Sequence, residues 1–100
     1  MAEGKTYRLH PEALQELEAA DDWYLQRSVD ASAAFIASVL DVFDAISRVP
    51  NRWPKYLYGT RRFVLNRFPF SVVYLDDPNA VLIIAVAHNK RRPGYRKQRL

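Results

Sequence analysis

Residues 70–87 read FSVVYLDDPNAVLIIAVA, and the rest of the architecture is organised around this stretch. Two apolar runs, residues 70–75 and 80–87, are separated by DDPN, a sequence of typical turn formers. Because β-branched residues are abundant in both runs, the pattern predicts two strands joined by a hairpin. The second run is apolar almost throughout, so we expect that strand to be central and covered on both faces.

Two further segments show strand-like alternation. Residues 60–68 alternate imperfectly around Phe63 and Leu65, and residues 5–9 alternate near the N-terminus. Residues 51–59, which precede the strand-like segment at residues 60–68, are irregular and rich in aromatic side chains.

The segment between these strands predicts two helices. Pro11 suits the first turn of a helix that we expect to end near Arg27, and Ser28 and Asp30 are candidate N-caps of a second helix that Pro50 closes. The apolar stripe of the first helix comprises Ala13, Leu14, Leu17, Ala20 and Tyr24, and its acidic face, interpreted as solvated, comprises Glu12, Glu16, Glu18 and Asp22. The expected buried side of the second helix comprises Phe35, Ile36, Val39, Leu40, Phe43 and Ile46.

The order of these elements is β-α-α-β-β-β, followed by a basic tail. We predict an α+β fold in which a helical hairpin, about residues 11–49, packs on a mostly antiparallel sheet, about residues 60–88. The chain has 100 residues, enough for a single domain spanning residues 1–100, with a basic C-terminal tail over residues 89–100.

Composition excludes several classes of function. The chain contains no cysteine, which excludes disulfide scaffolds and thiol catalysis. Its only three glycines are scattered and form no phosphate-binding loop, and its two histidines, His10 and His88, have no ligand spacing around them. We therefore expect no metal and no cofactor. The longest apolar run, residues 80–87, is far shorter than the roughly 18 residues of a membrane span, and we predict a cytoplasmic protein that does not contact membranes.

The charge is distributed unevenly along the chain. Residues 1–50 carry nine acidic and four basic side chains, whereas residues 51–100 carry eleven basic and two acidic ones. This asymmetry indicates either an anionic partner for the basic half or complementary halves within the fold. Aromatic residues are interleaved with the cations, an arrangement that can bind nucleic acid or an acidic protein.

Two motifs occur together in the second half: RFPFSVVY at residues 67–74 and VLIIAVAHNKRRPGYRKQR at residues 81–99. They follow a PEALQELEAADDWY segment and an ISRVPNRWP segment. In this combination the chain resembles the RelE/ParE family of type II toxin–antitoxin toxins, from about Tyr7 to Arg99. The resemblance implies a toxin that is neutralised by a cognate antitoxin in a hetero-oligomeric complex.

The resemblance leaves the cellular target open between two branches. RelE-like members cleave mRNA on the ribosome without a metal, and Arg62, Tyr95 and His88 fall where such an enzyme could use them. However, Val64, Ser71 and Asn89 stand where that branch has cations, and each missing oxyanion-type donor costs roughly 3–4 kcal/mol of transition-state stabilisation. We also expect His88 to lie near Arg67 across the hairpin, and a strand-end histidine bonded to backbone is the alternative role for it.

ParE-like members resemble this chain in the same motifs and poison DNA gyrase instead. We therefore favour a ParE-like gyrase poison, with a ribosome-dependent endonuclease as the alternative and a non-toxic antitoxin-binding module as a third possibility. The residues expected to contact the target or the antitoxin are Arg61, Arg62, Arg67, Arg91, Arg92 and Tyr95.

Overall fold

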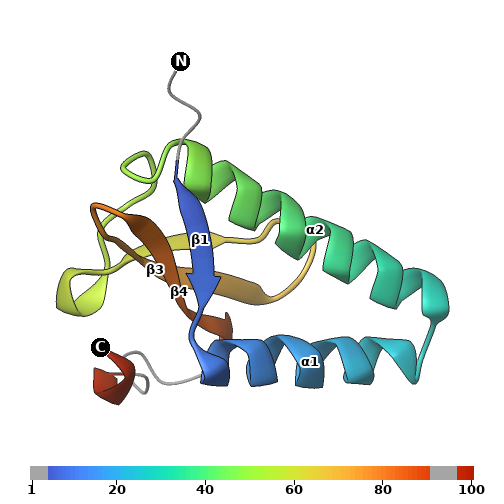
Figure 1. Ribbon diagram of the computed structural model, residues 1–100. Helices are drawn as coiled ribbons and strands as arrows, with labels where there is room; N and C mark the ends of the chain where they lie inside the picture. Colours follow the sequence, from blue (N-terminus) through green and yellow to red (C-terminus); the bar gives the residue numbers. More distant parts are fainter. Residues whose placement is uncertain (1–4, 91–96) are drawn as a thin grey trace.

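The computed structural model describes residues 5–90 and 97–100, and it confirms the predicted α+β architecture (Figure 1). One four-stranded sheet has the order β1-β4-β3-β2. The strands are β1 (Thr6–Leu9), β2 (Arg61–Val64), β3 (Phe70–Asp76) and β4 (Ala80–His88). Strand β1 is parallel to β4, whereas the β3–β4 and β2–β3 pairs are antiparallel. The sheet is therefore mixed and mostly antiparallel.

The two helices begin where local sequence signals place them. Helix α1 (Pro11–Leu25) starts with proline, and the Glu12 backbone N–H donates to His10 Nδ1 at 3.1 Å, which caps the first turn. Helix α2 (Val29–Arg48) is capped by Ser28, whose hydroxyl oxygen accepts from the Ala31 N–H at 3.2 Å. Of the two N-cap candidates, Ser28 is therefore the cap.

Both helices pack against one face of the sheet. Phe35 and Phe43 from α2 share a single buried core with Val72 and Tyr74 of β3 and Ile83 of β4. The other face carries a smaller buried cluster of Val73, Ala85 and Ala87, against which Tyr56 packs. Strand β4 is central and buried on both faces, as its nearly continuous apolar run predicts.

Four local expectations are wrong. Leu14 and Leu40 are 45% and 49% exposed, because they lie at the margins of their helical stripes. In α2, Val42, two residues after Leu40, is buried instead. Glu16 does not belong to a solvated face, since it accepts hydrogen bonds from β4 and from Arg99. Strand β2 ends at Val64 rather than at residue 68, because the chain turns back toward β3 from that point.

Tyr74 gives the protein a measurable dependence on alkaline pH. Its side chain is fully buried, its hydroxyl donates to the Pro50 carbonyl at 2.6 Å, and its pKa is raised to about 12. Burial is the main cause; the charge of Arg61 lowers the pKa and that of Asp76 raises it. Burial also raises the pKa of Tyr24.

We expect the free energy of unfolding to be constant below pH 10 with respect to Tyr74, and to fall by about 2–3 kcal/mol between pH 10 and 12. In that window only the unfolded state ionises, because the folded pKa lies above the unfolded one. Urea unfolding at a series of pH values measures the slope. Tyr74→Phe should cost about 1–2 kcal/mol at neutral pH and remove most of that slope; an unchanged slope would contradict the assignment.

Candidate functional site

The two arginines of β2, Arg61 and Arg62, lie on opposite faces of the sheet. Arg61 is structural, because its Nη1 donates to the Trp53 carbonyl at 2.7 Å. Arg62 pairs in register with Val73 and lies on the face opposite the helices, with its guanidinium 4.3 Å from the centre of the Tyr56 ring. Of these two predicted contact residues, Arg62 alone is directed at the surface away from the helices.

A second aromatic–cation pair borders this surface. The 3₁₀ turn η1 (Leu57–Gly59) contains Tyr58 at φ 58° and Gly59 at φ 78°, both in the left-handed region. A left-handed tyrosine is unusual and strained, and Tyr58 is 52% exposed. Lys97 Nζ, from the turn η2 (Lys97–Arg99), lies 5.2 Å from the centre of this ring. We call Tyr56, Tyr58, Arg62 and Lys97 the aromatic–cation surface.

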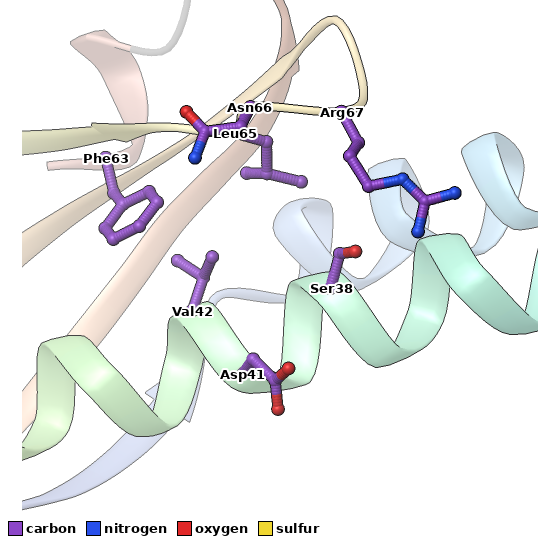
Figure 2. A pocket seen from close by; sticks show the side chains of 7 residues that line it. All are labelled: Ser38, Asp41, Val42, Phe63, Leu65, Asn66 and Arg67. Carbon is purple, nitrogen blue, oxygen red and sulfur yellow. The ribbon is translucent and has the colours of Figure 1, made fainter.

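Arg67 lies apart from that surface. It follows β2 in the loop to β3 and reaches down toward α2, where it lines a pocket of about 230 Å³ with Ser38 and Asp41 (Figure 2). Its guanidinium also lies 5.5 Å from the centre of the Phe68 ring.

His88 lies on the helical face of the sheet. It pairs in register with Phe70, the two rings meet edge to face with centroids 5.1 Å apart, and both line a pocket of about 270 Å³ beside Trp23 of α1. The Lys90 backbone N–H donates to His88 Nδ1 at 3.1 Å. The expectation that His88 lies near Arg67 is wrong, because the hairpin register places Phe70 opposite it. The backbone contact is the one expected of a strand-end histidine.

The structure consequently separates Arg62 from His88. Residues paired across adjacent antiparallel strands share a face, so Arg62 lies with Val73 on the outer face and His88 lies with Phe70 on the helical face. Tyr95, together with Arg91 and Arg92, is outside the described residues. The alternative catalytic set is thus not brought together by the residues that the structure describes.

Ser71 and Asn89, which stand where the resemblance predicts cations in an mRNA-cleaving toxin, form a hydrogen-bonded pair instead. Ser71 is buried, and its hydroxyl donates to the Asn89 side-chain oxygen at 2.6 Å. The third such position, Val64, is 47% exposed and apolar. Short polar and apolar groups therefore replace positive charge on this part of the outer face.

One important ion pair was not anticipated from the sequence. Arg99 makes a two-pronged contact with Glu16, at 2.9 and 3.1 Å, and the same carboxylate accepts from the Val86 N–H at 3.1 Å. Arg99 Nη1 also donates to the Ile84 carbonyl. No pattern in the sequence links residues so far apart, so only the tertiary structure could reveal this contact.

The described part of the chain offers neither a metal site nor a membrane span. Within residues 5–90 and 97–100, no group of three or more His, Cys, Asp or Glu side chains could hold a metal ion. No helix in the same part of the chain is long and apolar enough to cross a membrane.

The arrangement of a helical hairpin on a four-stranded mixed sheet is shared with a solved structure. A chain from "Chromosomal ParDE TA system from P. aeruginosa" superposes with a TM-score of 0.75, covering 87% of this chain and 98% of that one at 16% sequence identity, and so shares the fold. Residues 7–93 match the family described as "ParE toxin of type II toxin-antitoxin system, parDE". The chain belongs to this ParE toxin family, as its motifs predict.

A shorter similarity connects the chain to curated proteins of a different description. UPF0102 proteins of Brucella canis, Brucella suis and Brucella melitensis are 33% identical to it over 55 residues. The match covers 55% of this chain and spans only 40% of the length of those relatives.

Proposed function

We propose that this toxin inhibits growth by poisoning DNA gyrase and is neutralised by a cognate antitoxin. The observation that favours gyrase over mRNA is the separation of Arg62 and His88 onto opposite faces of the sheet. Metal-independent RNA cleavage needs a base, an acid and cations around one phosphate. The aromatic–cation surface, together with Arg91 and Arg92, would then contact gyrase or its DNA.

Charge and exposed apolar surface support an antitoxin partner. The chain has a strongly basic second half, and apolar side chains remain exposed on both helices, including Trp23 at 52% and Leu40 at 49%. A segment of the antitoxin that folds on binding would cover such apolar residues and place acidic groups against the cations. The two chains would form a hetero-oligomeric complex.

Expression without the antitoxin tests the proposal. We expect growth arrest with a DNA-damage response and intact messenger RNA, and accumulation of cleaved plasmid when the purified protein is mixed with gyrase, ATP and DNA. Arrest with messages cut inside codons would replace this proposal with the endonuclease. Harmless expression would favour the non-toxic binding module.

Two sets of variants sharpen that experiment. Tyr95→Phe should leave growth arrest nearly unchanged, because a gyrase poison needs no phenolic proton, whereas a nuclease using Tyr95 as an acid should lose about 100-fold or more of its activity. Charge reversal of Arg91 and Arg92 to Glu should weaken growth inhibition or antitoxin affinity. If both properties survive, these residues do not contact the target or the antitoxin.

A further inference from the structure

The turn η1 holds a strained tyrosine at the protein surface. Tyr58 has φ 58° and is 52% exposed, although asparagine or glycine would adopt this conformation with less strain. Thr60 maintains the turn, because its N–H and its hydroxyl both donate to the Leu57 carbonyl, at 3.2 and 2.6 Å. Strained residues that the surrounding structure holds in place are concentrated at functional sites. The Tyr58 ring is therefore a candidate contact with a ligand.

The cation beside this ring is held in place by the C-terminal turn. Lys97 is exposed, and its Nζ lies 5.2 Å from the centre of the Tyr58 ring. Two residues further on, Arg99 bonds to Glu16 of α1 and to the Ile84 carbonyl of β4, and its side chain is only 10% exposed. Because Arg99 fixes η2 against both elements, Lys97 is kept beside the Tyr58 ring. A ring and a cation so placed can bind a base and a phosphate of one strand.

Further cations lie on either side of η1. Arg62 follows the turn, and its guanidinium lies 4.3 Å from the centre of the half-buried Tyr56 ring. Lys55 precedes the turn, is exposed, and pairs through its backbone with Arg61. Together with Lys97, these side chains give the surface around Tyr58 several positive charges that a polyanion can bind.

Acidic side chains are concentrated elsewhere in the molecule. Residues 45–75 and 78–100 contain no Asp or Glu, whereas eight of the eleven acidic residues lie in α1 and α2. Trp23 of α1 is also 52% exposed, with the Arg27 guanidinium 3.5 Å from the centre of its ring. That pair belongs to the acidic helical layer, which repels a polyanion, so the two ring–cation pairs differ mainly in their electrostatic surroundings.

We propose that the aromatic–cation surface binds single-stranded DNA, with an unpaired base stacked on Tyr58 and neighbouring phosphates on Lys97 and Arg62. Bases inside a duplex are already stacked on one another, so only an unpaired base offers its face to the ring. An acidic peptide would pair with the cations, but its carboxylates gain nothing from the negative face of a tyrosine ring. That the strand is DNA rests on the proposed function, because a gyrase poison acts beside cleaved DNA; binding of an unpaired strand does not.

Fluorescence anisotropy with labelled oligonucleotides tests the proposal on the purified protein. A mixed-sequence DNA strand of about twelve nucleotides should bind at least about tenfold more tightly than an abasic strand of equal length, which keeps the phosphates but lacks the bases. The duplex of the same sequence should also bind more weakly than the single strand. Equal binding of the single and abasic strands would overturn the proposal. Complete displacement of the single strand by polyglutamate of equal total charge would also overturn it, in favour of an acidic protein ligand.

Variants locate the binding. Tyr58→Asn removes the ring at a position whose left-handed backbone suits asparagine, and should weaken the single strand at least about fivefold without affecting the abasic strand. Lys97→Gln removes a phosphate contact, so it should weaken both strands by a similar factor. Trp23→Ala and Arg48→Gln remove an exposed ring and an exposed cation from the helices and should change neither affinity. Thermal unfolding checks that the variants are folded, and unchanged affinity in folded Tyr58→Asn would overturn the proposal.

Oligonucleotide binding is measured without gyrase, so this inference and the proposed function can fail separately. If the protein traps no cleaved DNA with gyrase but binds the single strand through Tyr58, the target is wrong and the strand-binding surface stands. If Tyr58→Asn and the wild-type protein poison gyrase equally and neither prefers the single strand over the abasic strand, the target stands and this inference is wrong. An RNA strand of the same sequence that binds at least about tenfold more tightly than DNA would overturn the assignment to DNA.

Discussion

Replacing Arg99 by methionine is expected to lower the free energy of unfolding by about 3–5 kcal/mol. The Arg99 side chain is 10% exposed and that of Glu16 is 17% exposed, so the pair is largely removed from water. Loss of the guanidinium removes the two-pronged contact, at 2.9 and 3.1 Å, that Arg99 makes with this nearly buried carboxylate. Because Arg99 also donates to the Ile84 carbonyl, the substitution releases the C-terminal turn from β4. Chemical denaturation at neutral pH measures the change.

A surface ion pair provides the matched control. Arg48 and Asp44 are an i,i+4 pair on α2 with side chains 69% and 60% exposed, so Arg48→Met should change the stability by no more than about 0.5 kcal/mol. The double variant Glu16→Gln/Arg99→Met removes both charges of this pair, and it should recover a substantial part of the stability lost in Arg99→Met. Equal effects of Arg99→Met and Arg48→Met would mean that the C-terminal contact does not stabilise the fold.

Replacing Phe35 by alanine should have an effect of similar size, about 3–5 kcal/mol. Phe35 is fully buried, and its ring contacts those of Tyr24, Phe68 and Phe70 with centroids 4.9–5.3 Å apart. These rings join both helices to β3 and to the loop that precedes it. The cavity left by alanine cannot collapse easily, since its walls belong to three separate elements.

The functional consequence of Phe35→Ala follows from the loss of stability. Domains of this size are stable by about 5–15 kcal/mol, so this variant should be partly unfolded and should lose growth inhibition. Phe35→Leu retains most of the volume, should cost no more than about 1.5 kcal/mol, and should remain toxic. A stable but non-toxic Phe35→Ala variant would show instead that this residue has a direct functional role.

Local sequence patterns predict a large part of this fold. The DDPN turn, the apolar runs around it, Pro11 and Ser28 each act over a few residues, so their effects on strand pairing and helix starts can be inferred without the fold. Helix periodicity is less informative at the margins of a stripe, where Leu14 and Leu40 are exposed and Val42 is buried. At those positions the neighbouring element decides the burial.

The candidate site is less predictable, because its residues come from distant segments. Residue types alone identify Arg62 and Tyr56 as a cation and a ring, but their contact depends on how residues 54–56 fold back beside β2. The pocket beside Arg67 likewise needs α2 and β2 to be placed together. Both features arise from packing between segments rather than from local preference.

The position of His88 shows most clearly what the sequence determines and what the tertiary structure decides. The sequence by itself establishes that His88 ends a buried strand and that the chain carries the motifs of the ParE toxin family. Simple alternation from Val81 and Ile83 would place His88 on the outer face with Arg62. However, the register between β3 and β4 shifts by one residue at Ile84, and this bulge turns Val86 and His88 toward the helices. Only tertiary pairing decides this, because a bulge forms where packing on both faces of the strand favours it.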